Sequence, residues 1–281
     1  MAVRKHKPTT PGRRKSSVQD FSDITKTKPE KSLISALKSK AGRNNSGKIT
    51  VRHRGGGVKR MYRRIDFLRN RFEEAATVIA IEYDPNRGAR IALVQYEDGT
   101  KSYVLAAAGM KVDDKIVSSQ KKVEAVRGNR MPLSEIPASM FVYNVELEPG
   151  KGGQIVRGAG NAAQLMVVEG QYAQLKLPSS EMRLVKKECM ATVGQVSNPD
   201  YKLVRWGKAG RMRYKGIRPT VKGKNMNPVD HPHGGGEGHS PIGIKKGPRT
   251  KWGKPARGVK TRKPKQSDKF IVSRRKSKKK K

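Results

Sequence analysis

Residues 225–238, with the sequence NMNPVDHPHGGGEG, combine polar side chains with an unusually permissive backbone. Asp230, His231 and His233 bring one carboxylate and two imidazoles together, and these groups can stack on RNA bases or hydrogen-bond their edges. Four glycines without Cβ atoms let the backbone approach a crowded surface, and two prolines stiffen it. The composition therefore favours a segment that docks on nucleic acid over a solvated flexible loop.

The same segment offers donor atoms for a zinc ion, from Asp230, His231, His233, Glu237 and His239. Zinc sites commonly use cysteine ligands, or two histidines spaced four residues apart on one face of a helix. The segment has no cysteine and no helical pattern. We therefore expect no metal-binding residues here.

Two glycine-rich stretches partly match nucleotide-binding motifs. Residues 42–48 (GRNNSGK) have the spacing of a phosphate-binding loop up to its lysine, but Ile49 stands where that motif needs Ser or Thr. Residues 150–160 (GKGGQIVRGAG) are too irregular for a dinucleotide fingerprint, which also needs a strand–turn–helix frame. We expect turns at both places and no cofactor.

The charge of the 281-residue chain lies at its two ends. Sixty-three Lys and Arg residues against 23 Asp and Glu residues give a net charge of +40, of which +14 falls in residues 1–60 and +24 in residues 201–281. Residues 61–200 carry only +2 and hold most of the large apolar side chains. The middle can bury a core, whereas the ends repel themselves unless a polyanion neutralises them.

Short runs of β-forming residues, separated by turn residues, fill the middle region. We expect strands at residues 77–83, 89–96, 101–106, 140–147, 162–169, 172–178, 182–188 and 191–197. This spacing favours a mainly β fold of two small barrels. Pro29 and Glu30 open a short helical pattern with Leu33, Ile34 and Leu37 on one side. After about residue 200 we expect no regular elements.

Several classes of protein do not fit the sequence. No apolar run approaches the ~20 residues of a membrane span. The N-terminus is basic but lacks the apolar region of a secretory signal. Cys189 is the single cysteine, so no disulfide framework forms and a reducing compartment is expected.

Basic residues with a few aromatic residues among them lie on both sides of the 225–238 segment. They are Trp206, Lys208, Arg211, Arg213, Tyr214 and Arg218 before it, and Arg249, Lys251, Trp252, Lys254 and Arg257 after it. Basic groups contact phosphates, and aromatic faces stack on bases. Arg87 at the tip of the first expected hairpin and Arg157 beside glycines are also placed for phosphate contact. The polyanion is therefore expected to be a nucleic acid with single-stranded or irregular parts.

These motifs resemble the L-two family of large-subunit ribosomal proteins, in its bacterial-type form. The resemblance rests on NMNPVDHPHGGGEG together with GIRPTV, GKAGR, EYDPNR, GKITVRHRGGG and SDKFIV, and it covers essentially the whole chain. It implies an OB-fold barrel followed by an SH3-like barrel, with basic and largely irregular N- and C-terminal extensions. The implied segments are 1–60 (basic extension with a short helix), 61–125 (OB-fold-like barrel), 126–200 (SH3-like barrel) and 201–281 (basic Gly/Pro-rich extension that penetrates rRNA).

The resemblance also implies which residues contact rRNA. The family's two rRNA-contacting arginines fall on Arg87 and Arg157, and its functionally important Asp-His pair falls on Asp230 and His231. The complete candidate set for rRNA binding is Arg52, His53, Arg54, Arg87, Arg157, Lys208, Arg211, Arg213, Arg218, Asn227, Asp230, His231, His233, Gly234, Gly235, Gly236 and Trp252.

The function implied is that of a structural constituent of the large ribosomal subunit. Such a protein is a primary 23S rRNA-binding protein that supports subunit association, tRNA placement and the peptidyl-transferase region. Its expected partners are large-subunit rRNA, neighbouring ribosomal proteins and the small subunit at the interface, with no membrane, small-molecule substrate or cofactor. The expected location is the cytoplasmic ribosome, although an organellar ribosome also fits the sequence.

Two other functions compete with this interpretation. His231 could take direct part in peptidyl transfer as a general acid or base. The sequence offers no nucleophile or oxyanion site that converges on it, so we assign no catalytic residue and expect no enzyme. A free nucleic-acid chaperone or DNA-binding protein would share the charge pattern, but that protein would be found off the ribosome.

Overall fold

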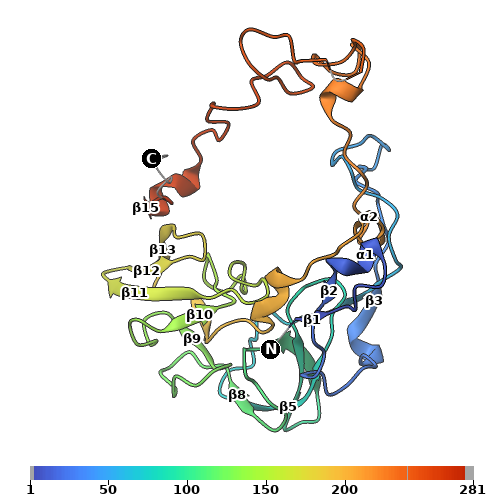
Figure 1. The fold of residues 1–281 in the computed structure, drawn as a ribbon. Helices are drawn as coiled ribbons and strands as arrows, with labels where there is room; N and C mark the ends of the chain where they lie inside the picture. Colours follow the sequence, from blue (N-terminus) through green and yellow to red (C-terminus); the bar gives the residue numbers. More distant parts are fainter. Residues whose placement is uncertain (1–2, 239, 276–281) are drawn as a thin grey trace. The chain divides into compact units, whose positions relative to one another are not determined.

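The computed structural model describes residues 3–238 and 240–275, and these form two compact units (Figure 1). Unit 1 comprises residues 3–38, 59–208 and 269–275. Unit 2 comprises residues 39–58 and 209–268. No helix among the described residues is long and apolar enough to cross a membrane.

The first sheet of unit 1 has four antiparallel strands in the order β7-β6-β5-β8, of which β5 and β8 are labelled in Figure 1. They are β5 (Ala75–Glu82), β6 (Ile91–Tyr96), β7 (Lys101–Leu105) and β8 (Lys115–Val117). Ala76 and Val78 on β5 are buried and alternate with more exposed neighbours, as expected when one face of a strand covers a core. Val78 is paired directly with the buried Val94 of β6, so the apolar pattern fixes the register.

The second sheet of unit 1 has seven antiparallel strands in the order β15-β13-β12-β11-β10-β14-β9. They are β9 (Arg130–Pro132), β10 (Phe141–Tyr143), β11 (Ala163–Glu169), β12 (Tyr172–Lys176), β13 (Met182–Lys186), β14 (Met190–Val193) and β15 (Ile271–Ser273). Leu165 and Leu175 are paired across β11 and β12 and are fully buried. The lone Cys189 lies in the same core, where burial raises the pKa of its thiol to about 12.

The predicted mainly β fold is confirmed, and each of the eight expected strands is present. β8, β9 and β15 were not expected, because three residues are too few to show an alternating pattern. In the described part of the chain, the first and last strands of each sheet do not pair with one another. The two sheets are therefore not closed into barrels by hydrogen bonding.

The helix expected from Pro29 is reduced to one 3-10 turn, η1 (Lys31–Leu33). The following residues form β3 (Ile34–Ala36), which pairs with β4 (Met61–Arg63). Pairing with a distant strand overrides the local helical pattern, and a β-branched isoleucine suits the extended backbone.

Buried polar contacts tie the N-terminal segment to the first sheet. Arg90 is almost fully buried, and its guanidinium donates to the Asp23 carboxylate, at 3.0 Å, and to the backbone oxygen of Asp20, at 2.6 Å. Further along, the Tyr103 hydroxyl donates to Glu82 at 2.7 Å and accepts the backbone N–H of Glu30 at 2.8 Å. Residues 19–30 are thus held in place without forming long regular elements.

The expectation of no regular elements after residue 200 was too strict. The chain forms the 3-10 helix η2 (Pro199–Leu203), the short helix α2 (Ala209–Tyr214), and the 3-10 helices η3 (Gly223–Asn225) and η4 (Gln266–Phe270). The paired segments β1 (Arg4–Lys5) and β2 (Ser17–Val18), with α1 (Pro11–Arg14) between them, form a similar short motif at the N-terminus. All are short, and α2 buries none of its residues.

Candidate nucleic-acid interface

The Asp84–Arg87 turn, between β5 and β6, holds Arg87 in place through a buried carboxylate. Asp84 is fully buried and accepts the Arg87 Nε–H at 2.6 Å and the backbone N–H of Asn86 at 2.8 Å. Arg87 itself is half-buried. A side chain with such partners has few rotamers left to lose when it binds a phosphate, so the turn presents Arg87 in a preorganised position.

The glycine-rich loop after β10 is fixed by another buried carboxylate. Glu146 accepts backbone N–H groups of Gly150 at 3.2 Å, Gly152 at 3.0 Å and Met190 at 3.1 Å. Its charge is balanced by the fully buried Arg130, whose Nη2 lies 2.7 Å from Glu146 Oε1. Burial lowers the pKa of Arg130 to about 10. The loop is therefore anchored from within the core.

Arg87 and Arg157 meet over one aromatic ring. The Arg157 guanidinium lies 4.4 Å from the centroid of the Phe67 ring, and that of Arg87 lies 5.7 Å from the same centroid. The loop reaches Phe67 because the Gly153 N–H donates to the Phe67 carbonyl at 2.9 Å. Two residues 70 positions apart in the sequence thus form one site, the Phe67 site, defined here as Phe67, Arg87 and Arg157.

In unit 2, residues 53–58 run antiparallel to residues 214–219. The N–H groups of Gly55 and Val58 donate to the carbonyls of Gly216, at 3.0 Å, and Tyr214, at 2.9 Å. His53 Nδ1 lies 3.2 Å from the Pro219 carbonyl, to which it donates. The pairing brings predicted residues from both segments to one place, namely Arg52, His53, Arg54, Arg213 and Arg218.

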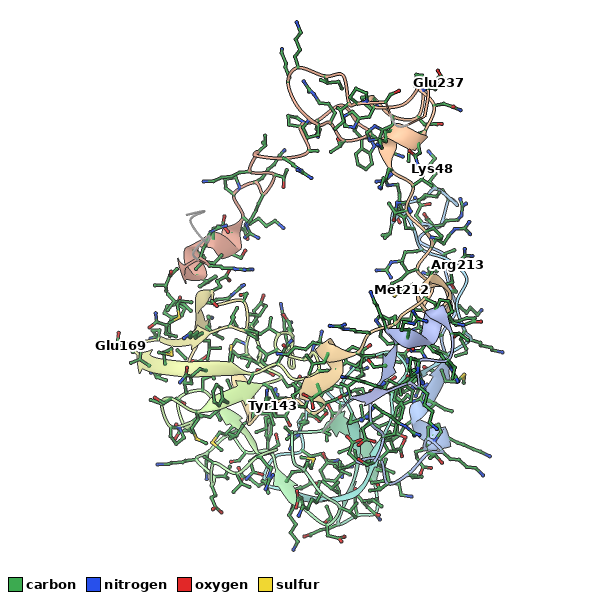
Figure 2. All side chains as sticks on the ribbon, viewed as in Figure 1. Lys48, Tyr143, Glu169, Met212, Arg213 and Glu237 are labelled. Atoms are coloured by element: carbon green, nitrogen blue, oxygen red, sulfur yellow. The ribbon has the colours of Figure 1, made fainter. Side chains whose placement is uncertain are left out.

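The arginines of this paired region are exposed, apart from a half-buried Arg211. Met212 and Arg213 are labelled on α2 in Figure 2. Arg54 and Arg218 are exposed on the two paired segments, and Lys208 is exposed at the end of the unit 1 segment that precedes α2. Exposed guanidinium groups on closely paired backbones make a dense positive surface that suits phosphate groups.

Replacing Gly57 by alanine is expected to open this paired region. An alanine Cβ there would lie 2.9 Å from the Gly216 nitrogen, at a φ of +97°. Gly56 is the matched control, because its φ is +64° and a Cβ there meets nothing within 4 Å. We expect the clash to add about 1–3 kcal/mol beyond the backbone strain common to both variants. Hydrogen exchange of the Gly55 and Val58 amides should be faster in Gly57→Ala than in Gly56→Ala, and equal rates would contradict this.

Residues 226–235 fold into a compact turn that depends on a glycine. The carbonyl of Asn227 accepts the N–H groups of Asp230 at 3.0 Å and His231 at 3.2 Å, and Gly235 donates to Met226 at 3.0 Å. A Cβ on Gly234 would lie 2.3 Å from the Asn227 oxygen. The predicted residues Asn227, Asp230, His231, His233 and Gly234–Gly236 are therefore brought together in one structure.

The two histidines of this turn use one ring nitrogen each as an acceptor. His231 Nδ1 accepts the His233 N–H at 3.0 Å, and His233 Nε2 accepts the Arg249 N–H at 2.8 Å. Each accepting nitrogen must carry a lone pair, which places the remaining proton on His231 Nε2 and on His233 Nδ1. The His231 ring also packs on the backbone of Gly223. The hydrogen bonds thus give His231 a structural role within the turn.

The phosphate-binding-loop match at residues 42–48, set aside on sequence grounds, has a plain structural explanation. Residues 44–48 close a tight turn in which Asn44 Oδ1 accepts the Lys48 N–H at 2.9 Å, and no strand–helix frame surrounds it. Among residues 3–238 and 240–275, no three His, Cys, Asp or Glu side chains are arranged to hold a metal ion. His239, one of the zinc candidates, lies outside the described residues.

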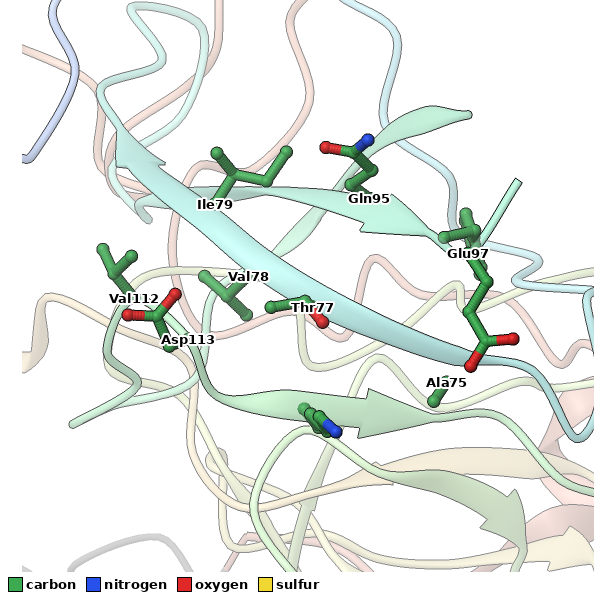
Figure 3. Close-up of a pocket in the computed structure, with 10 residues that line it drawn as sticks. Ala75, Thr77, Val78, Ile79, Gln95, Glu97, Val112 and Asp113 are labelled. Atoms are coloured by element: carbon green, nitrogen blue, oxygen red, sulfur yellow. The ribbon is translucent and has the colours of Figure 1, made fainter. Parts of the chain in front are cut away.

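A pocket of about 530 Å³ on the first sheet is lined by more carboxylates than cations, in contrast to the arginine-rich surfaces described above. Figure 3 shows Asp113 beside Val78 of β5 and Glu97 at the Ala75 end of the same strand. At the adjoining turn, the hydrogen bond from Arg71 lowers the pKa of Asp98 to about 2. The pocket is lined by two carboxylates, Glu97 and Asp113, against the single ammonium of Lys115, so it suits phosphate less well than the arginine-rich surfaces do.

These features define an RNA-binding protein built on two antiparallel β-sheets. The family model for Ribosomal Proteins L2, RNA binding N-terminal domain, matches residues 30–118, and the model for the C-terminal domain of Ribosomal Proteins L2 matches residues 126–253. The chain belongs to the L2 family of large-subunit ribosomal proteins. It is a structural, RNA-binding component of the ribosome, and its partners include rRNA.

Sequence reasoning missed three residues that build the interface. Phe67 supplies the ring shared by Arg87 and Arg157, while Asp84 and Glu146 are the buried carboxylates that hold the two turns. Asp84 could have been found from the sequence, because it opens an Asp-Pro turn and lies three residues before Arg87. Phe67 and Glu146 had none, because their roles depend on contacts made only in the folded chain.

Proposed function

We propose that the chain is a primary 23S rRNA-binding protein that supports subunit association, tRNA placement and the peptidyl-transferase region of a cytoplasmic ribosome. The observation that carries this proposal is the Phe67 site, where Arg87, held by the buried Asp84, and the exposed Arg157 lie against one aromatic ring. Phosphate contacts fix the position of a protein on RNA, and aromatic faces accept unstacked bases. The neighbouring ribosomal proteins and the small subunit complete the proposed set of partners.

Unit 2 supplies the second part of this function. Its exposed arginines and the 226–235 turn are proposed to fill rRNA crevices, where a polyanion neutralises their charge. The candidate residues of this unit are Arg52, His53, Arg54, Arg211, Arg213, Arg218, Asn227, Asp230, His231, His233, Gly234, Gly235, Gly236 and Trp252, and Lys208 lies just before it.

His231 is proposed to order rRNA and not to transfer protons in peptide-bond formation. Its Nδ1 already accepts the His233 N–H, and its ring packs on Gly223. A general base needs an accepting nitrogen free to face the reacting group. The engaged Nδ1 leaves only an N–H at Nε2, which is suited to donating to an rRNA acceptor.

Sucrose-gradient fractionation of a cell lysate, washed at high salt and probed with an antibody, tests the proposed function. We expect the chain to remain in the large-subunit peak, because a protein held only by exposed charges is stripped as salt screens them. Recovery at the top of the gradient would overturn the proposal. It would favour a free nucleic-acid chaperone or DNA-binding protein.

A further inference from the structure

A pocket of about 440 Å³ in unit 2 is lined by three stretches of the chain that are distant in sequence. Two of its lining residues are apolar, namely Val221 and Met226. The others are polar or charged, namely Arg52, Asn225, Asn227, Asp230 and Lys251. Pockets of roughly 300–1,000 Å³ bind small ligands. The volume therefore suits one nucleotide projecting from a strand and is too small for a base-paired helix.

Two of the lining residues, Arg52 and Lys251, are cations that contact the same aromatic ring. The Arg52 guanidinium lies 5.0 Å from the ring centroid of Trp252, and Lys251 Nζ lies 5.3 Å from it. Arg52 contacts both the indole and the pocket, so the indole fixes the position of a guanidinium plane in the pocket wall. A base can stack on such a plane, and the two cations can balance its phosphates.

The polar groups of the pocket form a matched set of acceptors and donors. Asp230 is exposed, and no group in the described part of the chain donates to its carboxylate. The N–H of Asp230 donates to the Asn227 carbonyl at 3.0 Å, which fixes the spacing of these two residues. The pocket therefore offers the two carboxylate oxygens of Asp230 as acceptors. The side-chain amides of Asn225 and Asn227 can both accept and donate.

Only one RNA base presents the complementary edge. Guanine carries two adjacent donors, N1–H and the N2 amino group, which can pair with both oxygens of a carboxylate, and its O6 accepts from an amide. Adenine and cytosine place an acceptor next to their amino group, and uracil has a single N–H between two acceptors. We propose that this pocket binds one unstacked guanine of the rRNA, with Asp230 reading its Watson–Crick edge and Arg52 stacking on its ring. The proposal rests on the proposed function, because it names the feature of rRNA that the site recognises.

Fluorescence anisotropy with dye-labelled RNA pentamers and the full chain tests the proposal at one fixed salt concentration. The pentamers are UUGUU, UUAUU, UUCUU and UUIUU, in which inosine lacks only the N2 amino group. A bidentate contact is expected to make UUGUU bind about ten- to a hundredfold tighter than UUAUU and UUCUU, with UUIUU between them. Equal binding of the four pentamers overturns the proposal.

Two variants identify the residues responsible. Asp230→Asn is expected to remove the preference for guanine, whereas the matched control Glu237→Gln, also exposed in unit 2 but outside the pocket lining, retains it. Arg52→Lys keeps the charge but loses the stacking plane, so it should weaken UUGUU more than Arg43→Lys does, since Arg43 is exposed in unit 2 and lies outside the pocket lining. A guanine preference that survives Asp230→Asn would overturn the assignment.

The two proposals fail in different ways. A chain that stays with large subunits in high salt but shows no guanine preference overturns the pocket and leaves the proposed function standing. A chain recovered off the subunits overturns the proposed function whatever the pentamers show.

Discussion

Replacement of Glu146 by alanine is expected to lower the free energy of unfolding by about 3–5 kcal/mol, because it leaves Arg130 buried without a counter-charge. Both side chains are at most 1% exposed, and the carboxylate also accepts three backbone N–H groups. A loss of this size is a large part of the ~5–15 kcal/mol that holds a typical domain together. Urea denaturation of the full chain, followed by the far-ultraviolet β-sheet signal, measures it.

Glu148→Ala is the matched control for this experiment. Glu148 lies two residues further on and pairs with Lys151 on the surface, where both side chains are more than half exposed. Exposed ion pairs contribute about 0–1 kcal/mol, so this variant should unfold close to the parent chain. If both variants lost the same stability, the buried Arg130–Glu146 pair would have no special role in anchoring the glycine-rich loop.

Replacing Arg157 by glutamine is expected to weaken binding to large-subunit rRNA by roughly tenfold to a hundredfold. A hydrogen bond to a charged group contributes about 1.5–3 kcal/mol, and Arg157 also loses its stacking on Phe67. The slope of log affinity against log salt concentration should become shallower by about one for the lost phosphate contact. Filter binding at several salt concentrations gives both quantities.

Lys115→Gln removes the same charge from the acidic pocket on the first sheet and serves as the control. Lys115 lines that pocket together with Glu97 and Asp113, and it is not among the residues proposed to contact phosphate. We expect its affinity and salt slope to match the parent chain. Equal losses from Arg157→Gln and Lys115→Gln would mean that net charge alone drives binding, and the Phe67 site would lose its assigned role.

The sheets were predictable from sequence because their strands show a local period. β5, β6 and β11 alternate or run apolar over six to eight residues between clear turns. β15 was not predictable, since its three residues form a strand only by pairing with β13 about 90 positions earlier. Ile34 shows the converse case, in which a distant partner converts a helical pattern into a strand.

The parts of the site that depend on residue type and local spacing could be predicted from the sequence. The parts that depend on contacts between distant residues could not. The density of basic, glycine and histidine residues marked unit 2 as an RNA-binding segment, and the two arginines at turns were named from the sequence. Buried Arg90, Arg130 and Glu146 could not be distinguished from surface charges, because burial is a property of the folded chain. Contacts between distant residues, such as Arg52 with Trp252, exist only in the folded chain, so no local sequence pattern marks them.

The position of β15 has a consequence for the order in which the protein is completed. A chain is synthesised from its N-terminus, and domains fold as their residues emerge. β13 can pair with β12 early, but its other edge stays open until residues 271–273 are made, some 85 residues later. During that interval a growing chain displays an unpaired strand edge, which other chains can pair with. The edge of β13 therefore stays open while the RNA-binding segment is being synthesised, and the three-residue β15 then replaces it with a shorter edge.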